Sequence, residues 1–335
     1  MSTSSSTSAR PGVTPYESLV DDAALFPPGN AALPDAVTAH QQHRRAPYAN
    51  LVGSFVISDS ALPDLLRELR TAPSTVAGPT EQPTEPLRVA VVVTGGAGAL
   101  EPAVRWAAGA NELDLRAVEI ALRDESDLAH NARRMATAVA QLVVSGHLGE
   151  DVAVYVEPPR LYGEPPSHSW LSALDELAAT DLRLKFRTGG LAADAFPSAS
   201  ELADCIESAL DRELRLKCTA GLHHALRHRD DTSGFEHHGF LNVLLATRAT
   251  LDGACPRDVA DLLDCSDPSI LVNLIARTGS AALMSARSWF TSFGSCSVSE
   301  PVEDLVGLGL LPDSVLQPAP QAAVRSAPDT ARERT

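Results

Sequence analysis

The sequence is short of the features that mark membrane, secreted and metal-binding chains. No apolar run approaches the roughly 20 residues needed to span a bilayer, and the amino-terminal stretch MSTSSSTSARPG lacks the apolar core of a signal peptide. The five cysteines are odd in number and scattered, without the C-x-x-C spacing of zinc or redox sites. We therefore expect reduced thiols, a soluble cytoplasmic protein and no membrane partner.

Positive charge is also scarce. The chain carries 27 Lys and Arg residues against 43 Asp and Glu residues, a formal net charge of -16. Such a chain repels a phosphate backbone wherever its field is not locally reversed. We expect no nucleic-acid partner.

The chain is long and apolar enough to form one large domain. Its 335 residues are 44% hydrophobic, which allows a sizeable core. Both ends are too polar or too rich in proline to pack, so residues 1–13 and 317–335 are expected to be disordered tails around a domain at 14–316. A similar stretch at 71–86 is expected to be a surface loop.

Short apolar runs alternate with segments of helical period along this domain. Leu128, Met135, Val139 and Leu142 share one helical face, and Ser198 to Glu201 reads as a capping box that opens another helix. The expected strands are an early run around Leu19 and the segments 50–58, 87–93, 115–123, 151–157, 182–187, 214–218 and 289–294. Eight repeats of strand and helix predict an α/β fold of the (β/α)8 TIM-barrel type. The alternative is an open doubly wound sheet, although no G-x-G-x-x-G follows its first strand.

In such a barrel the active site lies where the strands end and the following loops begin. Polar residues at these ends are therefore the candidates for chemistry. They are Asp21 and Asp22, Ser58, Glu119, Glu157, Lys185 with Arg187 and Thr188, Lys217 with Thr219, and Ser295 with Ser297. A charge inside a barrel strand must face a polar partner or the mouth of the barrel, because an unpaired buried charge is costly.

Lys185 and Lys217 occupy equivalent places on neighbouring predicted strands. Each could pair with Glu119 or Glu157 in a structural network. Alternatively, two like charges within several Å depress the pKa of at least one amine, which favours a Schiff-base nucleophile. A third interpretation is a clamp for a substrate carboxylate or phosphate, and spacing alone leaves these alternatives open.

Two lysine motifs suggest a family. The segment KFRTG at 185–189 resembles the K-x-x-T-G of strand six in the deoxyribose-phosphate aldolase family, and KCTAG at 217–221 is similar to its strand-seven motif. The resemblance covers roughly residues 88–299. It implies that Lys185 forms a Schiff base and that Lys217 lowers its pKa.

The same resemblance assigns further roles. The region 109–122 looks like the family's fourth strand, which implies that Glu119 relays protons, and SFGSCS at 292–297 looks like its phosphate-binding turn, with Cys296 in place of a serine. The expected substrate site, which takes an anionic end of the substrate, therefore combines the residues of these motifs with other strand-end candidates. It comprises Arg187, Thr188, Gly189, Gly190, Thr219, Gly221, Ser295, Ser297, Glu157 and Asp22.

Five of the ten histidines lie close together after the Lys217 motif. They could cover the site as a polar loop, take part in acid-base work, or bind a divalent metal such as zinc. Adjacent histidines diverge in regular structure, so a metal would take one from each pair, His224 and His238. No strong ligand spacing supports that alternative. The leading interpretation, a Schiff-base lysine, needs no cofactor.

The sequence thus favours a lyase of class I aldolase type acting on a small carbonyl or sugar-like substrate. The alternatives are a metal-dependent barrel isomerase or hydrolase that uses the histidines, and a non-catalytic barrel that binds a metabolite. A homo-oligomer is compatible with all three.

Overall fold

The computed structural model describes residues 14–71, 85–123 and 127–317. Its centre is a closed barrel of eight parallel strands in the order β1-β10-β7-β6-β5-β4-β3-β2. The barrel strands are β1 (Val20–Asp22), β2 (Val52–Ser58), β3 (Leu87–Val93), β4 (Leu113–Ala121), β5 (Ala153–Glu157), β6 (Arg183–Arg187), β7 (Leu216–Thr219) and β10 (Phe290–Ser295). The predicted TIM barrel is confirmed, and the open doubly wound alternative is excluded by closure between β1 and β2.

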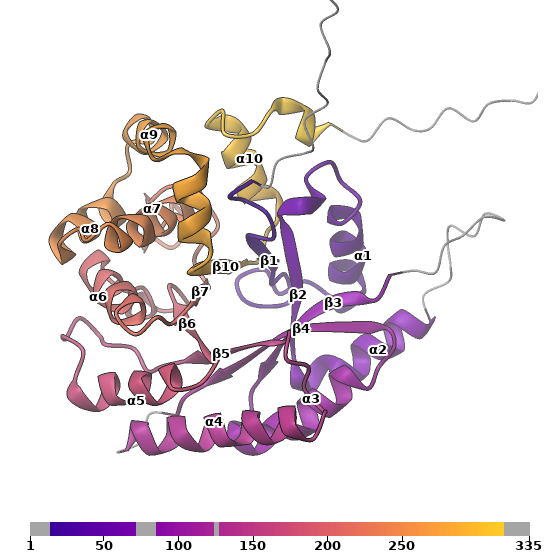
Figure 1. The fold of residues 1–335 in the computed structure, drawn as a ribbon. Helices are drawn as coiled ribbons and strands as arrows, with labels where there is room; N and C mark the ends of the chain where they lie inside the picture. The colour runs from indigo at the N-terminus through magenta and orange to yellow at the C-terminus, as the bar shows by residue number, and fades with distance from the viewer. Residues whose placement is uncertain (1–13, 72–84, 124–126, 318–335) are drawn as a thin grey trace, which may run out of the picture.

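Helices surround the barrel (Figure 1). In the described residues they are α1 (Leu33–His43), α2 (Leu62–Thr71), α3 (Leu100–Ala108), α4 (Leu128–Val144), α5 (His168–Ala178), α6 (Ala199–Leu210), α7 (Phe240–Leu251), α8 (Pro256–Asp264), α9 (Pro268–Arg287) and α10 (Ser299–Gly307). Short 3-10 turns lie at Ala49–Leu51, Asp59–Ala61, Ala97–Ala99, Ala193–Ala195 and Asp313–Leu316. The predicted face of α4 is buried as its period required.

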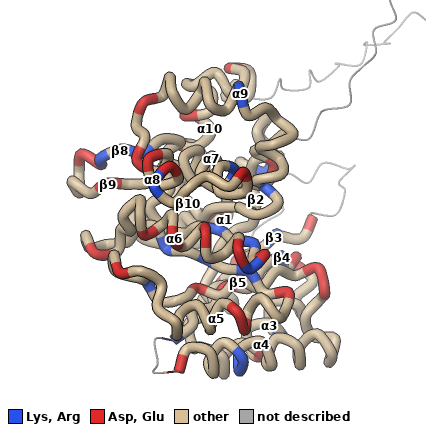
Figure 2. The backbone as a smooth tube through the Cα atoms, turned by 60° about the vertical axis from the view of Figure 1, so that its left-hand side comes forward, with Lys and Arg blue, Asp and Glu red and all other residues tan. Residues whose placement is uncertain are grey.

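The connection between β7 and β10 is longer than a single helix. It contains a small antiparallel hairpin of β8 (His228–Arg229) and β9 (Glu236–His237), followed by α7, α8 and α9. In Figure 2 this hairpin lies at the left-hand side, and acidic and basic residues are scattered over the outer elements. The eighth barrel strand therefore follows an inserted helical layer, where the sequence analysis expected simple alternation.

Helix α9 is long and apolar enough, by length and composition, to cross a membrane, and only 22% of an apolar 18-residue stretch within it is buried. Gly279, however, has φ 76° and ψ 157° and divides it into two helical pieces. Each piece is shorter than the roughly 20 residues a span requires. Helix α9 packs against α7 and β10, and we interpret it as part of the outer helical layer.

The apolar core has an outer and an inner part. Along each strand, side chains alternate between the helices and the barrel interior. Val118 and Ile120 belong to the outer core beneath the helices, whereas Ala117 belongs to a small separate cluster with Val56, Ala90 and Tyr155. Glu119 has the same parity as Ala117, so its carboxylate points into the barrel.

The segments expected to be tails lie outside the described residues, apart from Gln317. Most of the loop expected at 71–86 lies outside them as well. The division into a single domain with tails stays a prediction.

Candidate active site

The two lysines lie side by side inside the barrel. Lys185 on β6 and Lys217 on β7 are register partners, and their residues are 3% and 1% exposed. They are also the chain's only lysines among its 27 basic residues, the other 25 being arginine. Both primary side-chain amines of the whole protein therefore lie in one buried place.

Three carboxylates surround these amines. The Nζ atom of Lys217 lies 2.6 Å from Asp21 Oδ2 and 2.6 Å from Glu119 Oε1. The Nζ atom of Lys185 lies 3.1 Å from Glu119 Oε2 and 2.8 Å from Glu157 Oε2. Glu119 thus bridges the two lysines, with one oxygen on each. The structure brings together the three residues expected to be catalytic, and Asp21 joins them.

The network fixes the charge state of its members. Burial alone would raise the pKa of Glu119, but attraction by Lys217 and then by Lys185 outweighs it and lowers the pKa to about 2. Burial alone would lower the pKa of Lys217, but Asp21 and then Glu119 outweigh it, so this pKa is raised. At neutral pH Lys217 is an ammonium and Glu119 a carboxylate.

Asp21 is held in position by its own partners. Its Oδ1 accepts a hydrogen bond from the backbone N–H of Ser54 at 2.9 Å, and its Oδ2 accepts one from the Ser292 hydroxyl at 2.6 Å. A Cβ atom at Gly53 would lie 2.3 Å from Asp21 Oδ1, so the glycine leaves room for this carboxylate. Asp21 is one of the strand-end candidates expected from the sequence, but neither Asp21 nor Ser292 belongs to the expected substrate site.

Asp22 faces the other way. Its Oδ2 lies 2.9 Å from Nδ1 of His40 on α1, and its Oδ1 accepts a hydrogen bond from the N–H of Ala24 at 3.2 Å. The structure places this expected substrate ligand outside the lysine network. There it ties the loop after β1 to helix α1.

A tyrosine lies beneath the network. The Nζ atom of Lys217 is 5.2 Å from the centre of the Tyr155 ring, within cation-π range. The Tyr155 hydroxyl lies 2.8 Å from Thr291 Oγ1. Tyr155 is a functional candidate that sequence reasoning missed, because a lone aromatic in an apolar strand reads as core.

Arg187 closes the network toward solvent. Its Nε donates to Glu157 Oε1 at 3.0 Å, while its side chain is 45% exposed. Burial alone would raise the pKa of Glu157, but attraction by Lys185 and then by Arg187 outweighs burial and lowers this pKa. The carboxylate of Glu157 is therefore also ionised at neutral pH. The expected substrate-site residues Arg187 and Glu157 thus lie at the carboxyl end of the barrel, next to the amines.

The threonines and glycines expected to bind substrate make tight contacts within the protein. The Thr188 hydroxyl donates to the backbone oxygens of Thr219 and Ala220. A Cβ at Gly189 would lie 2.9 Å from the Gly221 Cα, and one at Gly190 would lie 2.6 Å from the Cβ of Ala195. The contacts of Thr188 and Gly189 join the loops after β6 and β7, whereas the contact of Gly190 lies within the loop after β6.

The two serines after β10 also have local partners. The Ser295 hydroxyl donates to the Ser297 backbone oxygen at 2.7 Å, and Ser297 Oγ accepts from the N–H of Glu300 at 3.3 Å near the start of α10. The role of these residues as an anion site stays a prediction.

The two histidines named for the alternative metal site are engaged elsewhere. His238 is fully buried, its Nε2 lies 2.8 Å from the Pro197 oxygen and its Nδ1 lies 3.2 Å from Arg227 Nη1. Because the arginine must donate, Nδ1 accepts and Nε2 donates, which leaves no lone pair for a metal. Burial lowers its pKa to about 4. His224 pairs with Asp304 at 3.1 Å, a hydrogen bond that raises the pKa of the imidazole.

Three histidine rings, including that of His224, form a cluster beside the mouth of the barrel. The rings of His224 and His228 are 4.6 Å apart and those of His228 and His237 are 5.2 Å apart. His223 lies between Glu300, at 3.2 Å, and the sulfur of Cys296, at 3.5 Å. Burial raises the pKa of this cysteine to about 11, so its thiol stays protonated. Within residues 14–71, 85–123 and 127–317, no group of three His, Cys, Asp or Glu side chains is arranged to hold a metal.

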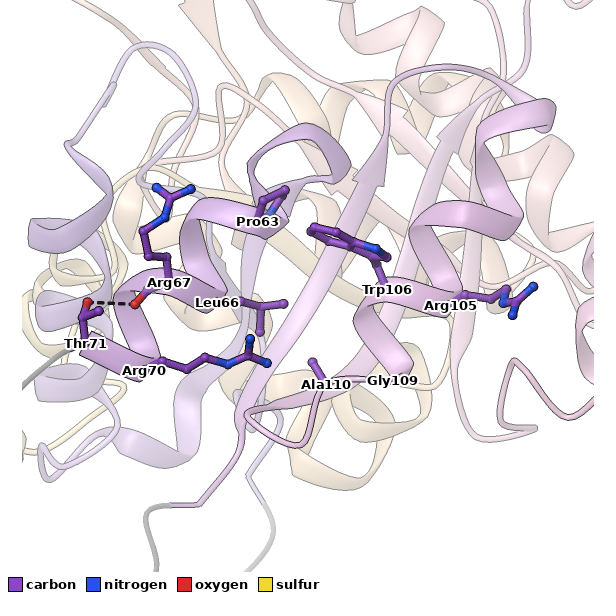
Figure 3. Close-up of a pocket in the computed structure, with 9 residues that line it drawn as sticks. All are labelled: Pro63, Leu66, Arg67, Arg70, Thr71, Arg105, Trp106, Gly109 and Ala110. Carbon is purple, nitrogen blue, oxygen red and sulfur yellow. Dashed lines mark hydrogen bonds between the residues drawn. The ribbon is translucent and has the colours of Figure 1, made fainter.

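A separate groove of about 590 Å³ lies on the outside of the barrel between α2 and α3. Figure 3 shows Trp106 over this groove, with Arg67 and Arg70 on the facing helix. Arg70 is paired with Glu112 at 2.7 Å and Arg67 with Asp64 at 2.8 Å. The groove shares no residue with the lysine network.

Comparison of the chain with models of known protein families and with curated protein sequences finds no match.

Proposed function

We propose that this TIM barrel is a lyase of class I aldolase type that uses Lys185 as its Schiff-base nucleophile. The motif-level resemblance to the deoxyribose-phosphate aldolase family supports this proposal. The proposed substrate is a small carbonyl or sugar-like compound that binds at the carboxyl end of the barrel. No metal takes part in the proposed reaction.

The use of lysine is the observation that carries the proposal. The chain uses arginine at 25 of its 27 basic positions and lysine only at 185 and 217. Arginine forms strong ion pairs with carboxylates but does not lose its proton in proteins, whereas lysine can become a neutral amine. Two lysines placed together in a lysine-poor chain therefore favour amine chemistry over a purely structural ion pair.

The contacts distinguish the two amines. Lys217 touches Asp21 and Glu119 at 2.6 Å each, and its raised pKa keeps it an ammonium. Lys185 has longer contacts, and its partner Glu157 is shared with Arg187. Lys185 is thus the better nucleophile, and Lys217 the more firmly protonated neighbour.

The reaction needs a base that can move protons between these groups. Glu119 Oε2, 3.1 Å from Lys185 Nζ, accepts the proton that the amine loses. The amine adds to the substrate carbonyl, Glu119 returns the proton to the resulting hydroxyl, and loss of this hydroxyl as water gives the iminium. The bond between the α and β carbons then breaks, its electrons move toward the iminium nitrogen, and the β-hydroxyl proton passes to Glu119. Protonation of the α carbon and hydrolysis release the second product and restore Lys185.

Arg187 is the proposed ligand for an anionic end of the substrate. Its side chain is half exposed at the carboxyl end of β6. Within the described residues, its side chain makes a hydrogen bond through Nε to Glu157, and its other guanidinium nitrogens make none. A guanidinium binds carboxylate or phosphate through paired donors. The cytoplasmic location and the absence of nucleic-acid and membrane partners are further parts of the proposal.

Reductive trapping tests the proposal. Protein treated with borohydride and a panel of small aldehydes and ketones should acquire a covalent adduct, which peptide mapping should find on Lys185. The amino terminus is the only other reactive amine besides Lys217, so intact mass gives a direct count. Lys185→Arg keeps the charge and should abolish trapping at this position.

Lys217→Met is the matched variant. It should leave the nucleophile in place and slow trapping at pH 7, because loss of a neighbouring positive charge favours the ammonium form of the remaining lysine. Trapping should recover as the pH rises. An adduct on Lys217 would reverse the two roles. Failure to trap any carbonyl compound that demonstrably binds would favour a non-catalytic metabolite-binding barrel.

A further inference from the structure

The barrel interior has an apolar side as well as a charged one. Val56, Ala90, Ala117 and Tyr155 form a cluster separate from the outer core. On β2 and β3 their neighbours along the strand belong to the outer core beneath the helices, so this cluster faces inward. The charged residues Lys185 and Lys217 come from β6 and β7, while this apolar surface comes mainly from β2, β3, β4 and β5.

One aromatic side chain from a loop completes this surface. Phe26, in the loop after β1, packs against the inner cluster together with Ala23 and Val92. It is half-buried, whereas its neighbour Leu25 packs against the outer core. The loop therefore sends Phe26 into the carboxyl-end opening of the barrel and the preceding side chain, Leu25, toward the helices.

The loop that carries Phe26 is firmly attached. The N–H of Ala23 donates to the Ser295 oxygen at 2.7 Å, and the N–H of Phe26 donates to the Ala23 oxygen at 2.9 Å. A Cβ at Gly29 would lie 2.8 Å from the Ala24 oxygen and 2.9 Å from the Cβ of Cys296. The loop thus packs against itself and against the turn after β10, which fixes the position of the ring.

This apolar surface adjoins the reacting groups. Val92 and Glu119 are register partners on β3 and β4, and Glu119 contacts both lysines. A carbonyl carbon bound to Lys185 would therefore lie next to Glu119, and beyond that carboxylate the second, apolar side of the interior begins with Val92 and the inner cluster against which Phe26 packs. A substrate that is polar throughout would leave this second side unmatched.

We infer that Phe26 and Val92 form a specificity surface that selects carbonyl substrates with an apolar substituent near the carbonyl. The inference rests on the proposed Schiff-base function and narrows its substrate class to carbonyl compounds that carry an aliphatic or aromatic group near the carbonyl. Each buried methylene should increase binding by about fourfold. Phe26 acts by contact with the substrate and takes no part in proton transfer.

The test uses reductive trapping of the full chain with acetaldehyde, propanal and pentanal at equal concentration. The adduct on Lys185 is measured by peptide mapping relative to the adduct on the amino terminus. In the wild-type protein this ratio should rise by about fourfold per methylene. Phe26→Ala should lower the increase of this ratio from acetaldehyde to pentanal by at least tenfold, and Phe26→Leu should lower it less. Leu25→Ala, in the same loop but facing the outer core, should keep the wild-type dependence.

The outcomes separate the inference from the function on which it rests. Trapping on Lys185 without chain-length dependence, or an unchanged dependence in Phe26→Ala, overturns the specificity surface and leaves the Schiff-base lysine standing. Absence of a Lys185 adduct with every aldehyde overturns both.

Discussion

Replacing Glu119 with glutamine removes the carboxylate that both buried lysines share. Each lysine keeps one partner, Asp21 for Lys217 and Glu157 for Lys185, but because Arg187 also pairs with Glu157, three cations then face two carboxylates. Holding the pKa of Glu119 at about 2 instead of 4.5 corresponds to about 3 kcal/mol of folding stability. Breaking buried ion pairs typically costs about 3–5 kcal/mol, which agrees. We expect Glu119→Gln to lower the free energy of unfolding at pH 7 by about 3 kcal/mol.

The pH dependence gives a second readout of the same group. The pKa is lower in the folded state, so the carboxylate contributes its full stabilisation above pH 4.5 and loses it as the pH falls toward 2. Urea denaturation followed by circular dichroism at pH 7 and pH 3 measures both values. At pH 3 the difference between wild type and Glu119→Gln should shrink to less than half. Glu112→Gln, an exposed change of the same type, should have a much smaller effect.

A double-mutant cycle tests whether the loss comes from the ion network. Lys217→Met removes the excess positive charge that Glu119→Gln creates, so the double variant should be more stable than the sum of the single losses predicts. Strict additivity, or a loss below about 1 kcal/mol in the single Glu119 variant, would contradict a charge network coupled through Glu119.

Three further changes have expected results. Because burial holds the pKa of His238 at about 4, below its ordinary 6.5, stability should fall by up to about 3 kcal/mol as the pH drops from 6.5 to 4, and His238→Gln should flatten that slope in acid denaturation. Ala220 has φ 62°, so Ala220→Gly should raise the urea midpoint by the equivalent of up to about 1 kcal/mol. Arg160→Ala should destabilise the protein by about 3 kcal/mol, because it strips the bidentate partner from the buried Glu201, and adding Glu201→Gln should recover part of that loss in thermal melting.

The fold could be predicted because barrel strands leave a local signal. Each strand is a short apolar run, and the order of runs and helical segments determines the layer architecture. The inserted helices α8 and α9 were not foreseen, because an extra helical repeat between two strands looks like one long connection. The three expected catalytic residues lie in contact because a charged side chain inside an apolar barrel strand must face a partner of opposite charge or the mouth of the barrel.

The remainder of the site depended on register and on long-range partners. Choosing between Asp21 and Asp22 requires the parity of a three-residue strand, and a shift of one residue exchanges the inner and outer faces. The capping box predicted at Ser198 forms its first half, with the Glu201 N–H donating to Ser198 Oγ at 3.1 Å. The glutamate side chain binds Arg160 instead, a residue too distant in sequence for the local motif to reveal.

Glycine was the least informative residue. Gly189 and Gly221 were expected at a ligand, and the structure shows two backbones meeting there. A close approach of backbone to ligand and a close approach of backbone to backbone both require the absence of a Cβ atom. The contrast between two lysines and 25 arginines is also present in the sequence, although the prediction of Lys185 and Lys217 rests on their strand positions and motifs.

The position of Asp21 on the first strand has a consequence for biosynthesis. Its partners Lys217 and Ser292 follow it by 196 and 271 residues, so the site joins the start of the chain to its last barrel strand. In a nascent chain β1 cannot complete its strand pairing until β10 has been made, and contacts of such long range are slow to form. Truncated or incompletely synthesised chains would lack Ser292 and the strand that seals the barrel. Asp21 would then have all of its partners only in chains that have been completed, and barrel closure would act as the maturation step of the site.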